Sequence, residues 1–456
     1  MRKYHKSIKD RTEPWLARLG RSRSHATFVC VTGSSAKSST TEMVSHVLAG
    51  LAPVHTQVLR NGLSSCVDTL RSIESQHDYV VCEIASDGPG SLQPKIDLVR
   101  PSVGVVTLVA LEHYSAFRSL EAVAEEKCKL VEALPKNGLA VLNHDDPLVR
   151  SMASRTRARV VTFGTSGGDY LITQIRASEP GKLNVTIAHQ GETFELETRL
   201  TGSHSYLPVA AAFACSHQLG VSPSLIKERL ANLQPLFGRC STHVIENGPV
   251  FINDTIKAPY HSIYLPINML AEFSAPRRRV VIGQIADYAG SPKSKYRDVY
   301  RASRMVADQV IFVGNNVHRS GASAEEIAAG HFVAKRSVEE AAAFIKDTAI
   351  PGEIILLKSA KNLHIERILL NFEHEVRCWE QSCGRKLNCV RCDSCTIPFG
   401  QQAEINKERK DLRRLRPSRW EALLVRWLPG IEETRSSSRS TAAACMVTLQ
   451  TKRLLD

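Results

Sequence analysis

Residues 28–41, with the sequence FVCVTGSSAKSSTT, decide the fold of this chain. An apolar run typical of a buried strand breaks into small residues, and a helical pattern follows. Small residues at such a turn let backbone N–H groups approach a phosphate, and the helix N-terminus adds a partial positive charge. Lys37 can reach the outer phosphates and the Ser38 hydroxyl can ligate Mg²⁺. The stretch therefore predicts a strand, a phosphate-binding loop and a helix.

The loop departs from the common phosphate-loop pattern G-x-x-x-x-G-K. The spacing from Gly33 to Lys37 is two residues shorter, and Ala36 stands where a glycine usually precedes the lysine. An ordinary turn between strand and helix, with a surface lysine, is the alternative on this evidence alone.

Length and composition set the class of protein. A chain of 456 residues is long enough for two or three domains, and 43% hydrophobic with 23% charged residues is typical of a globular protein. No apolar run is long enough to cross a bilayer, and residues 1–24 lack the apolar core of a secretory signal. We therefore expect a cytoplasmic enzyme.

The formal net charge of +13 suits an anionic ligand such as a nucleotide. Much of the excess lies in residues 2–23 and 407–419, and such charge runs are commonly solvated arms. A nucleic-acid role is therefore disfavoured.

Polar residues follow three further strand-like runs. Glu83 lies near the end of residues 79–85, Glu112-His113 follow residues 103–109, and Asn143 ends residues 139–143. Ligands bind at the carboxyl ends of strands in open α/β sheets, and a buried acid needs a partner or a metal. Glu83 and His113 are thus Mg²⁺ candidates, whereas an edge-exposed carboxylate and a structural histidine are the alternatives. By residue type alone, Asn143 and the aspartates after it favour a turn.

The remaining pattern predicts two α/β domains. Residues 168–200 alternate as antiparallel strands, and a helix follows over residues 203–219. Beyond residue 240, strands and helices alternate as in a Rossmann-like parallel sheet. The expected fold class is α/β, with a P-loop-type central domain of mostly parallel sheet, a C-terminal Rossmann-like domain and a small cysteine-rich segment. The expected boundaries are 1–25 for a basic leader, 26–239, 240–376, 377–396 for the cysteine-rich segment, and 397–456 for a basic tail.

Together these motifs resemble the Mur ligase superfamily over about residues 26–370, most closely the branch that adds D-alanyl-D-alanine to a cell-wall precursor. The family loop G-[TS]-x-G-K-[TS]-[TS] is matched except at Ala36. The resemblance implies an ATP-dependent ligase that forms an amide from a carboxylate and an amine through an acyl phosphate, with ATP and Mg²⁺ as cofactors. The residues that match the loop are Gly33, Ser34, Lys37, Ser38 and Ser39.

The resemblance also implies site residues elsewhere. Lys127 falls on a lysine that many members carbamylate, and Arg239, after Phe237-Gly238, falls on an arginine that faces ATP. Asp254 matches an aspartate that contacts the nucleotide from the last domain. The expected metal ligands are Ser38, Glu83 and His113, the expected catalytic residues are Lys37, Lys127, Arg239 and His113, and the expected nucleotide contacts are Gly33, Ser34, Lys37, Ser38, Ser39, Asn143, Arg239 and Asp254.

Departures from the family pattern bear on the substrate. Residues 255–259 follow the family's S-Y-N-A-N-P only loosely, and Lys358 and Glu366 match K-G-S-R-x-x-x-M-E while Ser359 and Lys361 replace its glycine and arginine. Cell-wall ligases carry a UDP-sugar-binding domain where only about 25 residues precede the first strand here. We therefore expect another small-molecule or peptide carboxylate and an amine as substrates. The alternative is a nucleotide-binding scaffold or regulatory protein that has lost ligation.

Five cysteines cluster late with the spacing C-x4-C-x5-C-x2-C-x2-C. This spacing favours a closed structural Zn²⁺ site, with an iron–sulfur cluster or unligated cysteines as the alternatives. The basic amphipathic stretch over residues 412–428 could dock on a protein partner or an anionic membrane surface. The cysteines are Cys378, Cys383, Cys389, Cys392 and Cys395.

Overall fold

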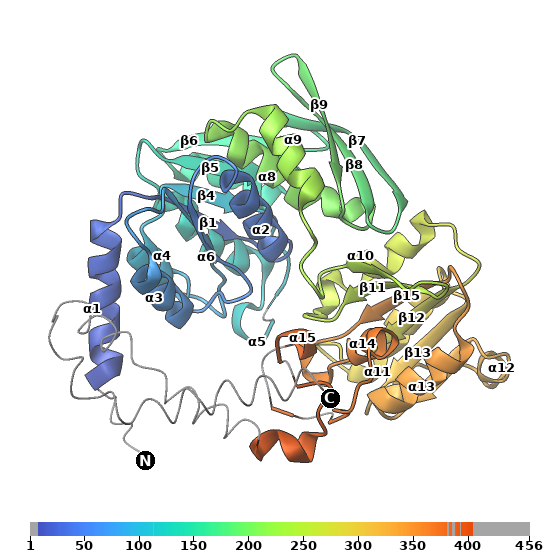
Figure 1. Cartoon of the computed structure of the whole chain (residues 1–456). Coiled ribbons are helices and arrows are strands. Elements are labelled where there is room, and N and C mark those ends of the chain that lie inside the picture. Colours follow the sequence, from blue (N-terminus) through green and yellow to red (C-terminus); the bar gives the residue numbers. More distant parts are fainter. Residues whose placement is uncertain (1–7, 113, 381–382, 385–387, 393, 405–456) are drawn as a thin grey trace, which may run out of the picture. The chain divides into compact units, whose positions relative to one another are not determined.

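A computed structural model describes residues 8–112, 114–380, 383–384, 388–392 and 394–404 of the chain. The chain divides into two compact units, residues 1–396 and 397–456. The first unit contains two β-sheets with helices packed on them, which Figure 1 shows in blue to green and in yellow to orange.

The first sheet has nine strands in the order β2-β3-β1-β4-β5-β6-β7-β8-β9 among the described residues. Its strands from β2 to β6 are parallel, and β7 to β9 continue the sheet as an antiparallel meander. The prediction of a mostly parallel sheet followed by antiparallel strands is confirmed. The strands are β1 (Thr27–Thr32), β2 (Val54–Gln57), β3 (Tyr79–Glu83), β4 (Val103–Val106), β5 (Leu139–Asn143), β6 (Arg159–Gly164), β7 (Tyr170–Glu179), β8 (Lys182–His189) and β9 (Glu192–Thr198).

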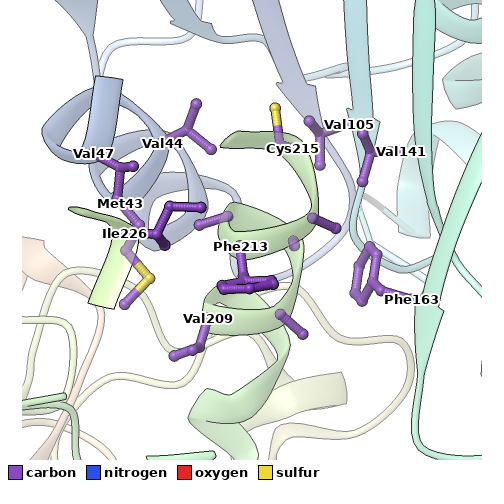
Figure 2. Close-up of a cluster of buried hydrophobic side chains, with 14 of the residues drawn as sticks. Met43, Val44, Val47, Val105, Val141, Phe163, Val209, Phe213, Cys215 and Ile226 are labelled. Atoms are coloured by element: carbon purple, nitrogen blue, oxygen red, sulfur yellow. The ribbon is translucent and has the colours of Figure 1, made fainter. Parts of the chain in front are cut away.

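Helices α2 and α8 bury one face of this sheet. Figure 2 shows Met43 of α2 and Phe213 of α8 in one apolar cluster with Val105 and Val141 of the strands. Small residues on α8, such as Ala211, are fully buried and allow the close approach of the two helices that the sequence predicts. The helices of this part are α1 (Ile8–Arg23), α2 (Lys37–Leu48), α3 (Leu63–Ser72), α4 (Gln93–Val99), α5 (Tyr114–Phe117), α6 (Leu120–Glu132), α7 (Pro147–Ser151), α8 (Tyr206–Gln218) and α9 (Pro223–Asn232).

The basic leader is not a solvated arm over its described part, which corrects the expectation from its charge. Helix α1 packs on α3 and α4. Arg21 Nε donates to the Val99 carbonyl at 2.6 Å, and its guanidinium lies 3.9 Å from the Phe28 ring centroid. The arginine is held because backbone carbonyls and an aromatic face satisfy its planar charge.

The second sheet has the order β10-β11-β15-β12-β13-β14 within the described part of the chain. All its neighbours are parallel except β10 and β11, so the Rossmann-like alternation predicted for this region is confirmed. The strands are β10 (Ser241–Val244), β11 (Val250–Asp254), β12 (Arg278–Ile282), β13 (Gln309–Val313), β14 (Phe332–Lys335) and β15 (Ile354–Lys358), and the helices are α10 (Tyr264–Asn268), α11 (Pro292–Arg304), α12 (Ala324–Ala328), α13 (Val338–Thr348), α14 (Arg367–Glu373) and α15 (Cys389–Cys392).

In the second unit the description ends at residue 404 and includes a short 3₁₀ turn, Phe399–Gln401. The amphipathic stretch expected over residues 412–428 lies outside the described residues. Within the described chain, none of the helices combines the length and the apolar character that a membrane crossing requires.

Candidate active site

The predicted phosphate loop joins β1 to α2 and is fixed to the end of β4. Gly33 has φ +142°, and a Cβ built on it would lie 1.9 Å from Thr107 Oγ1, so only glycine fits. The Ser34 amide donates to the Leu108 carbonyl at 2.8 Å, and Ser34 Oγ donates to the Ala110 carbonyl at 2.9 Å. These contacts hold the loop in one shape before any ligand arrives.

Ala36, where the family pattern has a glycine, has a left-handed backbone conformation. Its φ of 63° and ψ of −2° are left-handed, which costs an alanine roughly 1–2 kcal/mol. The departure at this position therefore adds backbone strain to the loop, in a conformation that a glycine adopts at no steric cost.

Ser38 and Glu83 converge at the start of α2. Ser38 Oγ donates to Glu83 Oε2 at 2.8 Å, and Glu83 is 1% exposed. The carboxylate also accepts from the Leu59 amide at 2.9 Å and from Asn61 Nδ2 at 3.0 Å. Burial alone would raise the pKa of Glu83, but Lys37 and other nearby donors outweigh it and lower the pKa below its usual value. The acid is thus buried and ionised, as a Mg²⁺ ligand must be.

Lys127 pairs with Glu112, a residue that the sequence analysis quoted without giving it a role. Lys127 is fully buried, and its amine donates to Glu112 Oε1. Lys37 Nζ lies 3.8 Å from Glu112 Oε2, so one carboxylate serves both lysines. Burial lowers the pKa of Lys127 to about 8, against the attraction of Glu112. The adjacent His113 lies outside the described residues, and its metal role stays a prediction.

Arg239 and Asp254 reach the same region from the other sheet. Arg239 NH2 lies 3.5 Å from Ser38 Oγ, and its buried Nε has no hydrogen-bond partner in the part of the chain that is described. Asp254 ends β11 beside Lys358 at the end of the parallel strand β15, and the two side chains form an ion pair. Two basic groups and an acid therefore face the loop across the pocket.

Asn143 does not line this pocket. Its side-chain oxygen accepts from the Asp145 amide at 3.0 Å, which is the turn that the sequence left as an alternative. Asp145 in turn accepts from the Thr165 and Ser166 amides at 2.7 and 2.8 Å. In this structure the segment stabilises a loop, and the nucleotide contact of Asn143 stays a prediction.

One pocket gathers most of the predicted loop and boundary residues. Sequence reasoning missed Lys257, His204 and Cys240 as pocket residues, although the loose match at residues 255–259 marked the place of the first. The predicted residues Gly33, Lys127 and Asn143 lie outside the lining. The lining consists of Ser34, Ser35, Ala36, Lys37, Ser38, Ser39, Glu83, Leu108, His204, Ser205, Leu207, Pro208, Arg239, Cys240, Asp254, Lys257, Pro259, Ser262, Leu265, Pro266 and Lys358.

The cysteine-rich segment packs on the second sheet through a polar cluster. Among the described residues, His364, Glu366 and Cys389 bring candidate metal-ligand atoms within 4.8 Å of one another, and all three are buried. Cys383 Sγ lies 3.2 Å from His364 Nε2, and Cys395 Sγ lies 3.3 Å from His374 Nε2. Three of the five predicted cysteines, Cys383, Cys389 and Cys395, therefore lie close to histidines that the spacing argument did not include.

Comparisons with known proteins agree with this geometry. Residues 31–216 match the family described as Mur ligase middle domain. The UDP-N-acetylmuramoyl-tripeptide–D-alanyl-D-alanine ligases of Synechocystis sp. and Escherichia coli K12 are 26% and 27% identical, over 74% and 66% of this chain and 73% and 68% of those proteins.

Solved structures agree in fold. MurF from Acinetobacter baumannii has a TM-score of 0.70 at 22% identity and covers 79% of this chain and 80% of its own. MurF ligase from Thermotoga maritima in complex with ADP has a TM-score of 0.68 at 22% identity, over 82% of this chain and 87% of its own. The predicted resemblance to the Mur ligase superfamily is thereby confirmed, through the middle domain over residues 31–216 and through the fold.

Proposed function

We propose that this protein is an ATP-dependent ligase that joins a carboxylate to an amine through an acyl phosphate. The observation that carries the proposal is the buried contact between Ser38 and Glu83, with Lys37 and Arg239 beside it. A hydroxyl, an ionised acid and two cations at a helix N-terminus form a site for a metal–nucleotide complex.

Mg²⁺ would be held by Ser38, Glu83 and His113, and it would supply charge neutralisation at the phosphates. The fit rests on Glu83, whose buried carboxylate is ionised and accepts short hydrogen bonds from three neutral donors. Oxygen donors of this kind are those that Mg²⁺ prefers.

The chain's own cations would stabilise the phosphoryl transfer. An oxygen of the substrate carboxylate attacks the terminal phosphorus of ATP, the bond from that phosphorus to the bridging oxygen of ADP breaks, and an acyl phosphate forms. Lys37 and the unsatisfied Nε of Arg239 would stabilise the negative charge that develops on the transferred group. The amine then attacks the carbonyl carbon, phosphate leaves and the amine loses a proton.

The substrates are proposed as chemical classes. The names of the two relatives describe ligases that act on a UDP-N-acetylmuramoyl-tripeptide and D-alanyl-D-alanine. For this chain we propose a small-molecule or peptide carboxylate and an amine, since residues 255–259 at the pocket depart from the family pattern. The cytoplasm, where ATP is available, is the proposed location, and the basic tail is the proposed contact for a protein partner or an anionic membrane surface.

We also propose a structural Zn²⁺ in the cysteine-rich segment. Support comes from the paired His364 and Cys383, whose N···S distance of 3.2 Å would need to widen only to roughly 3.6 Å for both atoms to ligate one tetrahedral Zn²⁺. His364 Nδ1 lies 3.2 Å from Glu366 Oε1, the orienting contact that metal-binding histidines commonly make through their second nitrogen.

Phosphate release with panels of carboxylates and amines tests the ligase proposal. Release that needs both substrates, and that Lys37→Ala abolishes while the exposed-site variant Lys227→Ala retains it, supports ligation. ATP binding without any substrate-dependent release across the panels would favour the scaffold alternative instead.

A further inference from the structure

We propose that Lys257 and His261, in the turn after β11, bind the terminal phosphate of the nucleotide and the acyl phosphate made from it. The inference rests on the proposed function and adds two residues to it. Lys257 lies within residues 255–259, which depart from the family's S-Y-N-A-N-P, and His261 lies two residues after this stretch.

The backbone of the turn is fixed on two sides. Lys358 Nζ donates to the Lys257 carbonyl at 3.0 Å, the Ala286 amide donates to the Ala258 carbonyl at 2.8 Å, and the Tyr260 amide donates to the Ala286 carbonyl at 3.0 Å. A residue held in this way can aim a flexible side chain at one place without ordering the whole loop on binding.

The turn is also joined to the loop that presents Arg239. The Ile256 amide donates to the Gly238 carbonyl at 3.3 Å, and a Cβ on Gly238 would lie 2.8 Å from Ile256 Cγ1. Gly238 has φ +80°, so both the conformation and the space require glycine there. Lys257 and Arg239 are therefore presented to the pocket from adjoining backbone segments.

The amine of Lys257 is available to a ligand. Its side chain lines the pocket and is exposed to the water in it, and it makes no hydrogen bond or ion pair with any other described residue. The other two pocket lysines are engaged, Lys37 with the Gly33 carbonyl and Glu112, and Lys358 with Asp254. An unpaired ammonium beside so many polar groups is the expected arrangement for an anion that arrives from outside.

The surrounding charges place this amine at the outer-phosphate end of the site. Burial, Lys37 and Arg239 together lower the pKa of Lys257 to about 8, while Glu83 and Glu112 oppose them. These are the residues around the proposed Mg²⁺ and the phosphate loop. A bound phosphate would restore the full positive charge on the amine.

His261 supplies the second free group. Both ring nitrogens are buried and neither has a hydrogen-bond partner in the described chain. Such an imidazole loses its hydration without compensation unless a ligand provides a partner. His261 lies directly after Tyr260, whose amide is fixed to the Ala286 carbonyl, and Glu112 and Lys37 act electrostatically on both His261 and Lys257.

Nucleotide titrations test the assignment without knowledge of the substrates. We compare the affinity for Mg²⁺ with a non-hydrolysable β,γ-imido ATP analogue and with ADP, by calorimetry, in wild type, Lys257→Ala, His261→Ala and the control Lys227→Ala. A contact to the terminal phosphate should make Lys257→Ala lose about tenfold in affinity for the triphosphate, or more, and little for ADP. Lys257→Arg should keep most of the triphosphate affinity.

Equal losses for both nucleotides, or none, would overturn the assignment and point to another role for the turn, such as binding the substrate carboxylate. The ADP titration also reports whether each variant is folded. If wild type binds neither nucleotide, the proposed function fails rather than this inference.

Discussion

The Ser38 hydroxyl lies 2.8 Å from Glu83 Oε2, although the two residues are 45 positions apart in the sequence. The contact joins the start of α2 to the end of β3, because β1 and β3 are parallel neighbours whose carboxyl ends share one edge. It creates a buried oxygen pair at the N-terminus of a helix, next to the phosphate loop. A cation and the phosphates it neutralises would be bound by the same few atoms.

Replacing Glu83 by glutamine should lower substrate-dependent phosphate release by roughly 100-fold or more, because a neutral amide cannot supply the charge that a Mg²⁺ ligand needs. The release rate at several Mg²⁺ concentrations measures the effect. Glu246→Gln, at an exposed position, is the control and should behave as wild type. A normal rate of phosphate release in Glu83→Gln would show that the Glu83 carboxylate is not a required Mg²⁺ ligand.

Ala36→Gly should raise the free energy of unfolding by about 1 kcal/mol, since it relieves a left-handed alanine. Ala122→Gly in α6 should lower it by a similar amount, because glycine is unfavourable inside a helix. Denaturant unfolding of both variants and of wild type measures the change in the free energy of unfolding and its sign. A loss of stability in Ala36→Gly would contradict the strain that we assign to this loop.

The lowered pKa of Lys127 should make the free energy of unfolding depend on pH. Its pKa is about 8 in the folded protein and near 10.5 when exposed, so the unfolded state binds more protons between these values. The stability of wild type relative to Lys127→Met should therefore rise as the pH increases through this window. Unfolding curves at several pH values test the slope. If the difference in unfolding free energy between wild type and Lys127→Met does not change with pH, the pKa of Lys127 is not lowered in the folded protein.

The cysteine-rich segment should contain about one Zn²⁺ per chain, as measured by elemental analysis of protein purified without added metal. His364→Ala and Cys383→Ser should reduce the metal content, because these side chains bring a histidine nitrogen and a cysteine sulfur within 3.2 Å of each other. Cys215→Ser, in the core of the first sheet, should leave it unchanged. Full metal content in His364→Ala would contradict the histidine ligand and indicate that cysteines alone bind the metal.

Sequence patterns predicted the parts of the site that are local in the chain. The loop around Lys37, the strand ending in Glu83 and the alternation of the second domain are visible because period and residue type are local signals. The ion pairs Lys127–Glu112 and Lys358–Asp254 could not be predicted, since the first depends on how α6 packs against the loop after β4 and the second on which strands become neighbours. Family patterns still pointed to Lys127 and Asp254 one at a time.

Other parts of the site depend on packing that sequence alone does not reveal. His364 lies outside any cysteine spacing pattern and meets Cys383 only because the segment folds back onto β15 and α14. The leader had the composition of a solvated arm, yet α1 packs through Ala17 and Arg21. In both cases an unremarkable residue gained its role from a tertiary contact.

Calorimetric titration of ATP, with and without Mg²⁺, onto wild type, Lys37→Ala and Lys227→Ala tests the central claim most directly. The account predicts Mg²⁺-dependent binding that Lys37→Ala weakens by about tenfold or more and Lys227→Ala leaves unchanged. Binding that ignores both Mg²⁺ and Lys37, or no binding to wild type, would contradict it.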